Sequence, residues 1–176
     1  MLISFKDYPG FTPNLTPRQI FEYGSFGGGY FRDIENPSHS GTAALTNLPP
    51  DLWQGIDKNL MLISTPDKKN NKYGVNAGTS LEAWRSKGWI NEELDPYGWV
   101  QWYCHFYYGR RVSDDARQIQ RWSSFAGPNG RFRRRLISEI NKKKGKFDDH
   151  TISPVIRQSL QHWGYVLTEK DYNGIK

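Results

Sequence analysis

Residues 95–108, DPYGWVQWYCHFYY, decide the fold, because large aromatic side chains recur in them with the period of a helix. Positions i, i+3, i+4, i+7 and i+8 are occupied by Trp99, Trp102, Tyr103, Phe106 and Tyr107. This stripe is typical of a helix with one buried face. We therefore predict a central helix that opens at Asp95-Pro96, with Asp95 as its cap, and runs to about Tyr108.

Start and stop signals place further helices on both sides of this stretch. A capping residue followed by proline or by an acid marks a helix start, and glycine marks a helix end. Such starts are found at Thr16, Ser113 and Ser153, and residues 79–82 match a capping box of Thr79 and Glu82. Helices are expected over residues 17–23, 80–87, 114–126, 132–140 and 154–163. The chain is thus predicted to be mainly α, a single domain over residues 1–176 with five or six helices and an aromatic core.

Two segments interrupt this helical pattern. Residues 1–15 contain proline and glycine and are expected to form an extended arm. Residues 36–76 are expected to be a loop-rich insertion, in which only residues 48–63 have enough apolar side chains for a short helix or a docking strand. We expect this insertion to pack on the helical body.

The composition favours an intracellular protein of the cytoplasm or nucleus. Cys104 is the single cysteine, so no internal disulfide can form, and no metal site or cofactor is expected. No stretch approaches the roughly 20 apolar residues of a membrane span. Cys104 and His105 are adjacent on a helix and point about 100° apart. We therefore interpret both as packing residues, and His162 as a histidine of the core or its rim.

Positive charge is concentrated in one part of the chain. Residues 110–146 hold twelve Lys or Arg and three acids, a net charge of +9, whereas the whole chain has a net charge of +6. A general solubility charge would be spread evenly, so this segment, within the basic helical part at residues 110–164, predicts an acidic partner.

We interpret the protein as one that binds nucleic acid, with DNA favoured over RNA. Arginine forks and lysines grip phosphates, Arg and Gln can read base edges, and surplus Trp and Tyr could stack on bases. Asp114 and Asp115 could instead pair with Arg117 and Arg121. The candidate contacts are Arg110, Arg111, Arg117, Gln118, Arg121, Arg131, Arg134, Arg135, Lys142, Lys143, Lys144 and Arg157.

Two other functions stay open. An enzyme acting on nucleic acid or nucleotides, by base excision or phosphodiester cleavage, could use Asp33 as its carboxylate. The glycines Gly27, Gly28 and Gly29 could cradle a phosphate, although the segment lacks the Gly-Lys-Ser/Thr ending of a P-loop, and close packing against aromatic side chains is the favoured role. An interaction module for an acidic protein is the third reading.

Several motifs resemble a family of short uncharacterised proteins found in bacteria, large DNA viruses, fungi and algae. The motifs are FGGGYF at 26–31, GTSLEAW at 78–84 with GWI at 88–90, DPYGWVQWYC at 95–104, DDARQIQRW at 114–122, GRFRR at 130–134 and IRQSLQHWGY at 156–165. The likeness covers most of residues 16–168. It implies membership of a class and assigns no activity.

Overall fold

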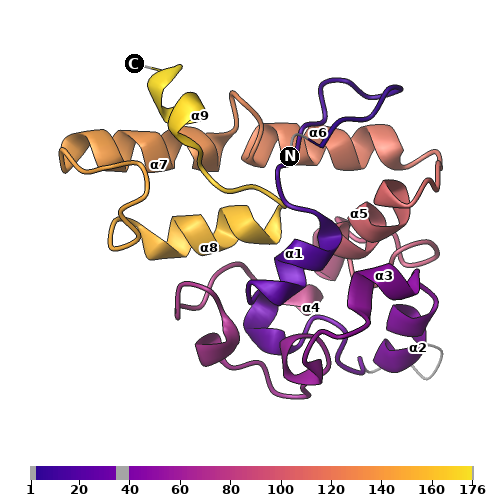
Figure 1. Ribbon diagram of the computed structural model, residues 1–176. Helices are drawn as coiled ribbons and strands as arrows, with labels where there is room; N and C mark the ends of the chain where they lie inside the picture. The colour runs from indigo at the N-terminus through magenta and orange to yellow at the C-terminus, as the bar shows by residue number, and fades with distance from the viewer. Residues whose placement is uncertain (1–2, 35–39, 176) are drawn as a thin grey trace.

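The computed structural model describes residues 3–34 and 40–175, and this part of the chain contains nine α-helices and no β-strand (Figure 1). The predicted mainly α fold is therefore confirmed. The α-helices are α1 (Pro17–Glu22), α2 (Gly41–Thr46), α3 (Pro50–Trp53), α4 (Leu81–Ser86), α5 (Trp99–Tyr107), α6 (Asp115–Phe125), α7 (Arg131–Lys142), α8 (Pro154–His162) and α9 (Glu169–Asn173). Three 3-10 helices, η1 (Phe26–Gly28), η2 (Lys58–Leu60) and η3 (Lys68–Asn70), lie between them.

Helix α5 lies in the core, as its aromatic stripe predicts, but it begins later than expected. Its first residue is Trp99, and the residue before it, Gly98, has a φ of 94°. A side chain at Gly98 would also meet Ile90, since an added Cβ would lie 2.9 Å from the Ile90 Cδ1 atom. The prediction that Asp95-Pro96 opens the helix, with Asp95 as its cap, is thus wrong. Residues 95–98 instead form a turn that leads into α5.

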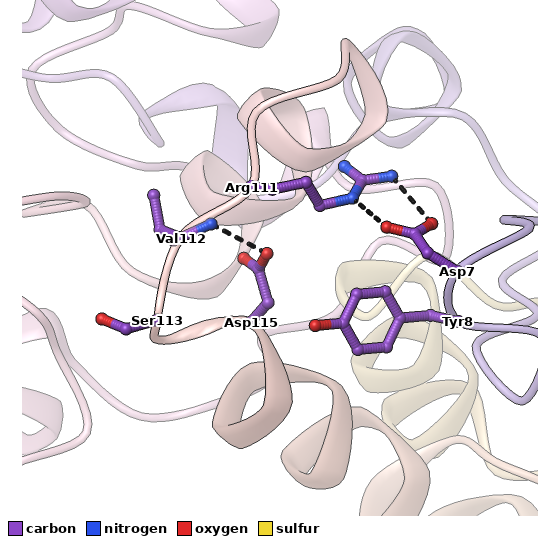
Figure 2. A pocket seen from close by; sticks show the side chains of 6 residues that line it. All are labelled: Asp7, Tyr8, Arg111, Val112, Ser113 and Asp115. Atoms are coloured by element: carbon purple, nitrogen blue, oxygen red, sulfur yellow. Dashed lines mark hydrogen bonds and ion pairs between the residues drawn. The ribbon is translucent and has the colours of Figure 1, made fainter.

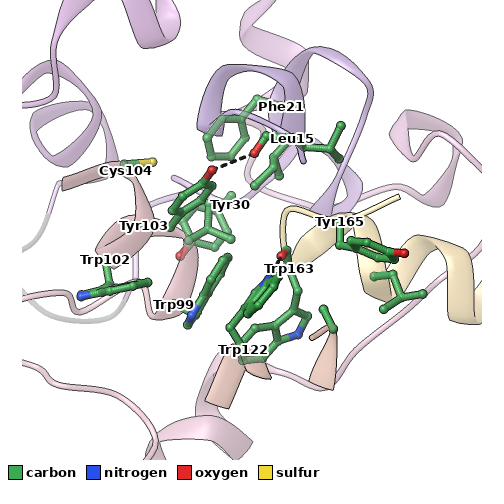
Figure 3. Packing of buried hydrophobic residues seen from close by; sticks show 14 of the residues in the cluster. Leu15, Phe21, Tyr30, Trp99, Trp102, Tyr103, Cys104, Trp122, Trp163 and Tyr165 are labelled. Atoms are coloured by element: carbon green, nitrogen blue, oxygen red, sulfur yellow. Dashed lines mark hydrogen bonds between the residues drawn. The ribbon is translucent and has the colours of Figure 1, made fainter. Parts of the chain in front are cut away.

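Several Trp and Tyr side chains of the core make hydrogen bonds through their polar atoms. The indole of Trp102 donates to Asp115 at 2.9 Å, and the indole of Trp122 donates to the Trp163 carbonyl at 2.9 Å. The hydroxyl of Tyr103 donates to the Leu15 carbonyl at 2.8 Å, the bond that is dashed in Figure 3. Buried rings of this kind need a partner for each donor. These bonds therefore tie α5 and α6 to the N-terminal segment and to the end of α8.

Three helix starts differ in detail from their predicted caps. The cap of α4 is Ser80, which accepts from the Ala83 amide, while Thr79 accepts from the Trp84 indole, so the predicted capping box is wrong by one residue. Helix α6 follows Asp114 rather than Ser113, and Ser153 makes no side-chain cap before α8.

The insertion docks on the body through backbone hydrogen bonds. The Gly28 carbonyl accepts from the Ile63 amide at 3.2 Å, and the Gly27 carbonyl accepts from the Asp67 amide at 3.0 Å. Residues 48–63 contain the short helices α3 and η2, so the expected helix is found and the alternative strand is not. Helices α2 and η3 lie in parts of the insertion that were expected to be loop, so that expectation is wrong there.

Helices α7 and α8 lie side by side at one end of the molecule, away from α2 and α3 (Figure 1). The inner face of α7 buries Leu136, Ile137 and Ile140, which leaves its opposite face at the edge of the fold. Among the residues that the structure describes, no helix is long and apolar enough to cross a membrane.

Candidate nucleic-acid interface

The outer face of α7 presents three exposed arginines in one row. Arg131, Arg134 and Arg135 fall at i, i+3 and i+4, and all three side chains are exposed. The arginine between them, Arg133, points inward, where it pairs with Asp171 at 2.7 Å. The amphipathic pattern of α7 thus separates a structural arginine from three that face solvent.

Lysines extend this row beyond the end of the helix. Lys142, Lys143, Lys144 and Lys146 are exposed, and the first of them pairs with Glu139 at 3.1 Å. We define the α7 basic face as the exposed cations of this helix and of the turn after it: Arg131, Arg134, Arg135, Lys142, Lys143, Lys144 and Lys146. Apart from Lys142, none has an ion-pair partner within residues 3–34 and 40–175.

Three predicted contacts upstream of α7 are engaged in ion pairs. Arg117 and Asp114 pair at 2.6 Å, one of the two arrangements that the sequence allowed for this arginine. Arg111 and Asp7 also pair at 2.6 Å, beside an open recess that Asp115 also lines; the Asp115 carboxylate accepts from the Val112 amide at 2.9 Å (Figure 2). The hydrogen bond from Arg111 lowers the pKa of Asp7, and the hydrogen bond to Asp114 raises the pKa of Arg117. Both pairs are therefore ionised and locally neutral.

Arg110 belongs to a buried ion cluster that sequence reasoning missed. The carboxylate of Asp95 is fully buried and lies 2.5 Å from an Arg110 guanidinium nitrogen and 2.8 Å from His105 Nδ1. His105 therefore makes a polar contact, contrary to its interpretation as a packing residue. Its partner, Asp95, lies ten residues earlier in a turn, so no helical spacing indicated the contact. Cys104, by contrast, is fully buried in the core, as predicted.

Three indole rings lie around the guanidinium of Arg121. Its guanidinium lies 5.4 Å from the ring centres of Trp84 and Trp163 and 5.7 Å from that of Trp89. It also donates to the Gln118 side chain and to the Trp89 carbonyl, each at 2.9 Å. Burial, together with the charge of the neighbouring Arg117, lowers the pKa of Arg121 to about 10. These contacts give Arg121 a structural role.

Two other predicted contacts are in the interior. Gln118 is fully buried, and its side chain is shared between Asp114 and Arg121. Arg157 is 4% exposed and donates to the carbonyls of Ile152 and Phe147, each at 2.9 Å. Neither side chain reaches the surface, so neither belongs to the α7 basic face.

The glycine loop has no free amide to offer a phosphate. The Gly27 amide donates to Asn71 at 2.7 Å, the Gly28 amide to Ser25 and the Gly29 amide to Phe26. A Cβ on Gly28 would lie 2.0 Å from the Asn59 carbonyl oxygen, so these glycines pack against the backbone of the insertion rather than against aromatic rings. The phosphate-cradle hypothesis is therefore not supported by the loop's hydrogen bonds.

Asp33 is exposed, and in the described part of the chain it lines neither the recess beside Asp7 nor the pocket beside the glycine loop. Its carboxylate accepts from the Gly41 amide at 2.8 Å, a bond that ties it to the start of α2. A general base works beside the proton that it removes and in a site shaped for substrate. The surroundings of Asp33 add nothing to its hypothetical catalytic role. In the part of the chain that the structure describes, no group of three or more His, Cys, Asp or Glu could hold a metal ion.

His162 anchors the glycine loop from α8. It is buried, stacks on Phe26 with 3.9 Å between ring centres, and its Nε2 atom accepts from the Phe26 amide at 3.0 Å. Burial lowers the pKa of His162 to about 3. This histidine is thus neutral at physiological pH, and it lies in the core as predicted.

Acid is expected to destabilise the protein through His162. Below its ordinary pKa of about 6.5 the histidine of the unfolded chain takes up a proton, whereas the folded protein resists protonation until about pH 3. The contribution of His162 to the free energy of unfolding is complete above about pH 6.5. It is lost, by up to about 1.4 kcal/mol per pH unit, as the pH falls towards 3. At pH ~4.5 the loss is about 2–3 kcal/mol.

The measurement is the free energy of urea unfolding at about pH 6.5 and at about pH 4.5, for the native protein and for His162→Gln. Glutamine can still accept from the Phe26 amide but does not titrate. The variant should lose about 2–3 kcal/mol less than the native protein on acidification. An identical loss in both proteins would show that His162 does not carry this pH dependence.

The arrangement thus separates one exposed, largely unpaired cationic face from arginines that serve the fold. No protein-family model, curated protein or solved structure matches the sequence.

Proposed function

We propose that the protein binds nucleic acid through the α7 basic face. The observation that carries this proposal is the contrast between α7 and the arginines before it. Arg110, Arg111 and Arg117 are neutralised by carboxylates, whereas six of the seven cations of the α7 basic face have no ion-pair partner in the described residues. Exposed cations that lack partners are available to displace the counterions of a phosphate backbone.

The geometry of the face favours duplex DNA. A 12-residue helix such as α7 is about 18 Å long, and the major groove of B-DNA is about 12 Å wide and admits a helix. The major groove of duplex RNA is deep and narrow, so side chains do not read it. The row of arginines along one face of α7 matches the phosphates that border the major groove of B-DNA.

The positions of the aromatic side chains argue against single strands. Proteins that bind single strands stack bases on exposed rings beside a cationic groove. Among residues 3–34 and 40–175, the exposed large aromatics are Tyr23, Trp89 and Tyr108, and none of them is on α7. Most Trp and Tyr side chains of the described residues are packed in the core or against it, which leaves few of them available to stack on bases.

Fluorescence anisotropy of labelled duplex DNA, single-stranded DNA and duplex RNA tests the proposal. Duplex DNA should bind most tightly, and if six cations reach phosphates its affinity should fall roughly 10³-fold between about 50 and 200 mM salt. A gel of the recovered DNA should show intact strands. Cleaved or abasic strands would indicate an enzyme instead. Absence of binding at low salt would reject the proposal and leave an acidic protein as the partner to seek.

A further inference from the structure

A pocket of about 220 Å³ lies on a different part of the molecule from the α7 basic face. It is bounded by the glycine loop, by residues 66–81 and by α4, and none of the residues that line it belongs to α7. Pockets for drug-sized ligands measure roughly 300–1,000 Å³. The smaller volume holds a single planar ring system, and the rest of a larger ligand would extend outside the pocket.

Aromatic side chains form the walls of this pocket, and the structure holds them in place. The Tyr30 hydroxyl donates to the Tyr97 carbonyl at 2.6 Å, and the Tyr97 hydroxyl donates to the Arg32 carbonyl at 2.9 Å. The Trp84 indole donates to Thr79, and Phe26 is stacked on a buried histidine. Walls that are already ordered lower the entropic cost of binding a flat ring.

Cations border the same pocket. Arg32 lines it, and no carboxylate of the described residues lies within ion-pair distance of its guanidinium. Burial raises the pKa of Tyr97, the charge of Asp33 adds to that rise, and the guanidinium groups of Arg32 and Arg85 act against it, so one carboxylate and two cations lie near this wall. A guanidinium without a carboxylate partner favours a ligand with an anionic group.

An amide at the pocket can select a heteroaromatic ring. Asn76 lines the pocket and is exposed at its rim, and no hydrogen bond joins its side chain to the residues that the structure describes. A primary amide offers a donor and an acceptor side by side, which matches the edge of a nucleobase. The Arg32 guanidinium donates to the Gly29 carbonyl at 3.1 Å and has no ion-pair partner in the described residues. With the aromatic wall and the amide, it offers the kinds of group that hold a base and its phosphate.

We propose that this pocket binds a nucleoside monophosphate, with the base against the aromatic walls and the phosphate at Arg32. The site is independent of the nucleic-acid surface on α7. Isothermal titration calorimetry with the four common nucleoside monophosphates, the matching nucleosides and inorganic phosphate tests it on the full chain. At least one nucleotide should bind more tightly than its nucleoside and more tightly than phosphate alone.

Two variants locate the binding. Ala77→Trp places a large side chain at the pocket wall and should weaken nucleotide binding at least about tenfold. Arg32→Gln removes a charge-assisted contact and should weaken nucleotide binding about 10- to 100-fold while leaving nucleoside binding unchanged. Circular dichroism checks that both variants are folded.

A control with Arg131, Arg134 and Arg135 all changed to Glu should keep the native nucleotide affinity, which separates this proposal from the one for α7. Loss of nucleotide binding in that control would place the ligand on α7 and overturn the pocket proposal. Undiminished binding in Ala77→Trp and Arg32→Gln, equal binding of phosphate alone, or no binding of any nucleotide would also overturn it.

Discussion

Changing Arg131, Arg134 and Arg135 together to Glu is expected to weaken binding to duplex DNA at least about 100-fold at low salt. Each arginine is expected to donate to a phosphate, and a hydrogen bond to a charged group is worth about 1.5–3 kcal/mol. The slope of log affinity against log salt should also become shallower by about 2.7, since each phosphate contact contributes about 0.9. All three side chains are exposed, so the variant should keep the native helix content.

A matched control separates a local contact from a general change of charge. Lys58, Lys68 and Lys69 are exposed on η2 and η3, and changing these three to Glu alters the net charge by the same amount. This control should bind with nearly native affinity and with a native salt slope. Equal weakening in both variants would show that only the net charge matters and would contradict a binding face on α7.

Replacing Asp95 by Ala is expected to lower the free energy of unfolding by about 3–5 kcal/mol. The Asp95 carboxylate is fully buried and is the partner of both His105 and Arg110, whose side chains are 24% and 25% exposed. Its loss leaves two largely buried polar groups without their partner, and Arg110 Nε already has none in the described structure. Urea unfolding followed by circular dichroism measures the change.

The ion pair of Asp7 with Arg111 provides the comparison. Its geometry is similar, at 2.6 Å, but the side chains are 50% and 35% exposed. Solvent screens exposed ion pairs, so Asp7→Ala should leave the urea midpoint of unfolding nearly unchanged. A cost for Asp95→Ala as small as that for Asp7→Ala would contradict the structural role of the buried cluster.

The sequence predicted the features that depend on local periodicity. The stripe of Trp99, Trp102 and Phe106 identified α5 because a helix places such positions on one face. The exposed row of Arg131, Arg134 and Arg135 followed from the same rule. Neither prediction needed knowledge of which other segments pack nearby.

The features that depend on distant contacts were not predictable in this way. Asp95 precedes a proline and has the pattern of a cap, but the fold brings it to Arg110, fifteen residues away. Gln118 has the pattern of an exposed helical position, yet it is buried between α6 and its neighbours. The amides of the glycine loop donate hydrogen bonds to Asn71 and to local carbonyls. Tertiary packing settles each of these roles.

Chemical-shift mapping tests the proposed interface most directly. The backbone amide spectrum of the ¹⁵N-labelled protein is recorded while unlabelled duplex DNA is added at low salt. The account predicts that the largest shifts fall within residues 131–146, with small shifts on η2 and η3. Shifts concentrated elsewhere, or no shifts at a DNA concentration that saturates the anisotropy signal, would contradict it.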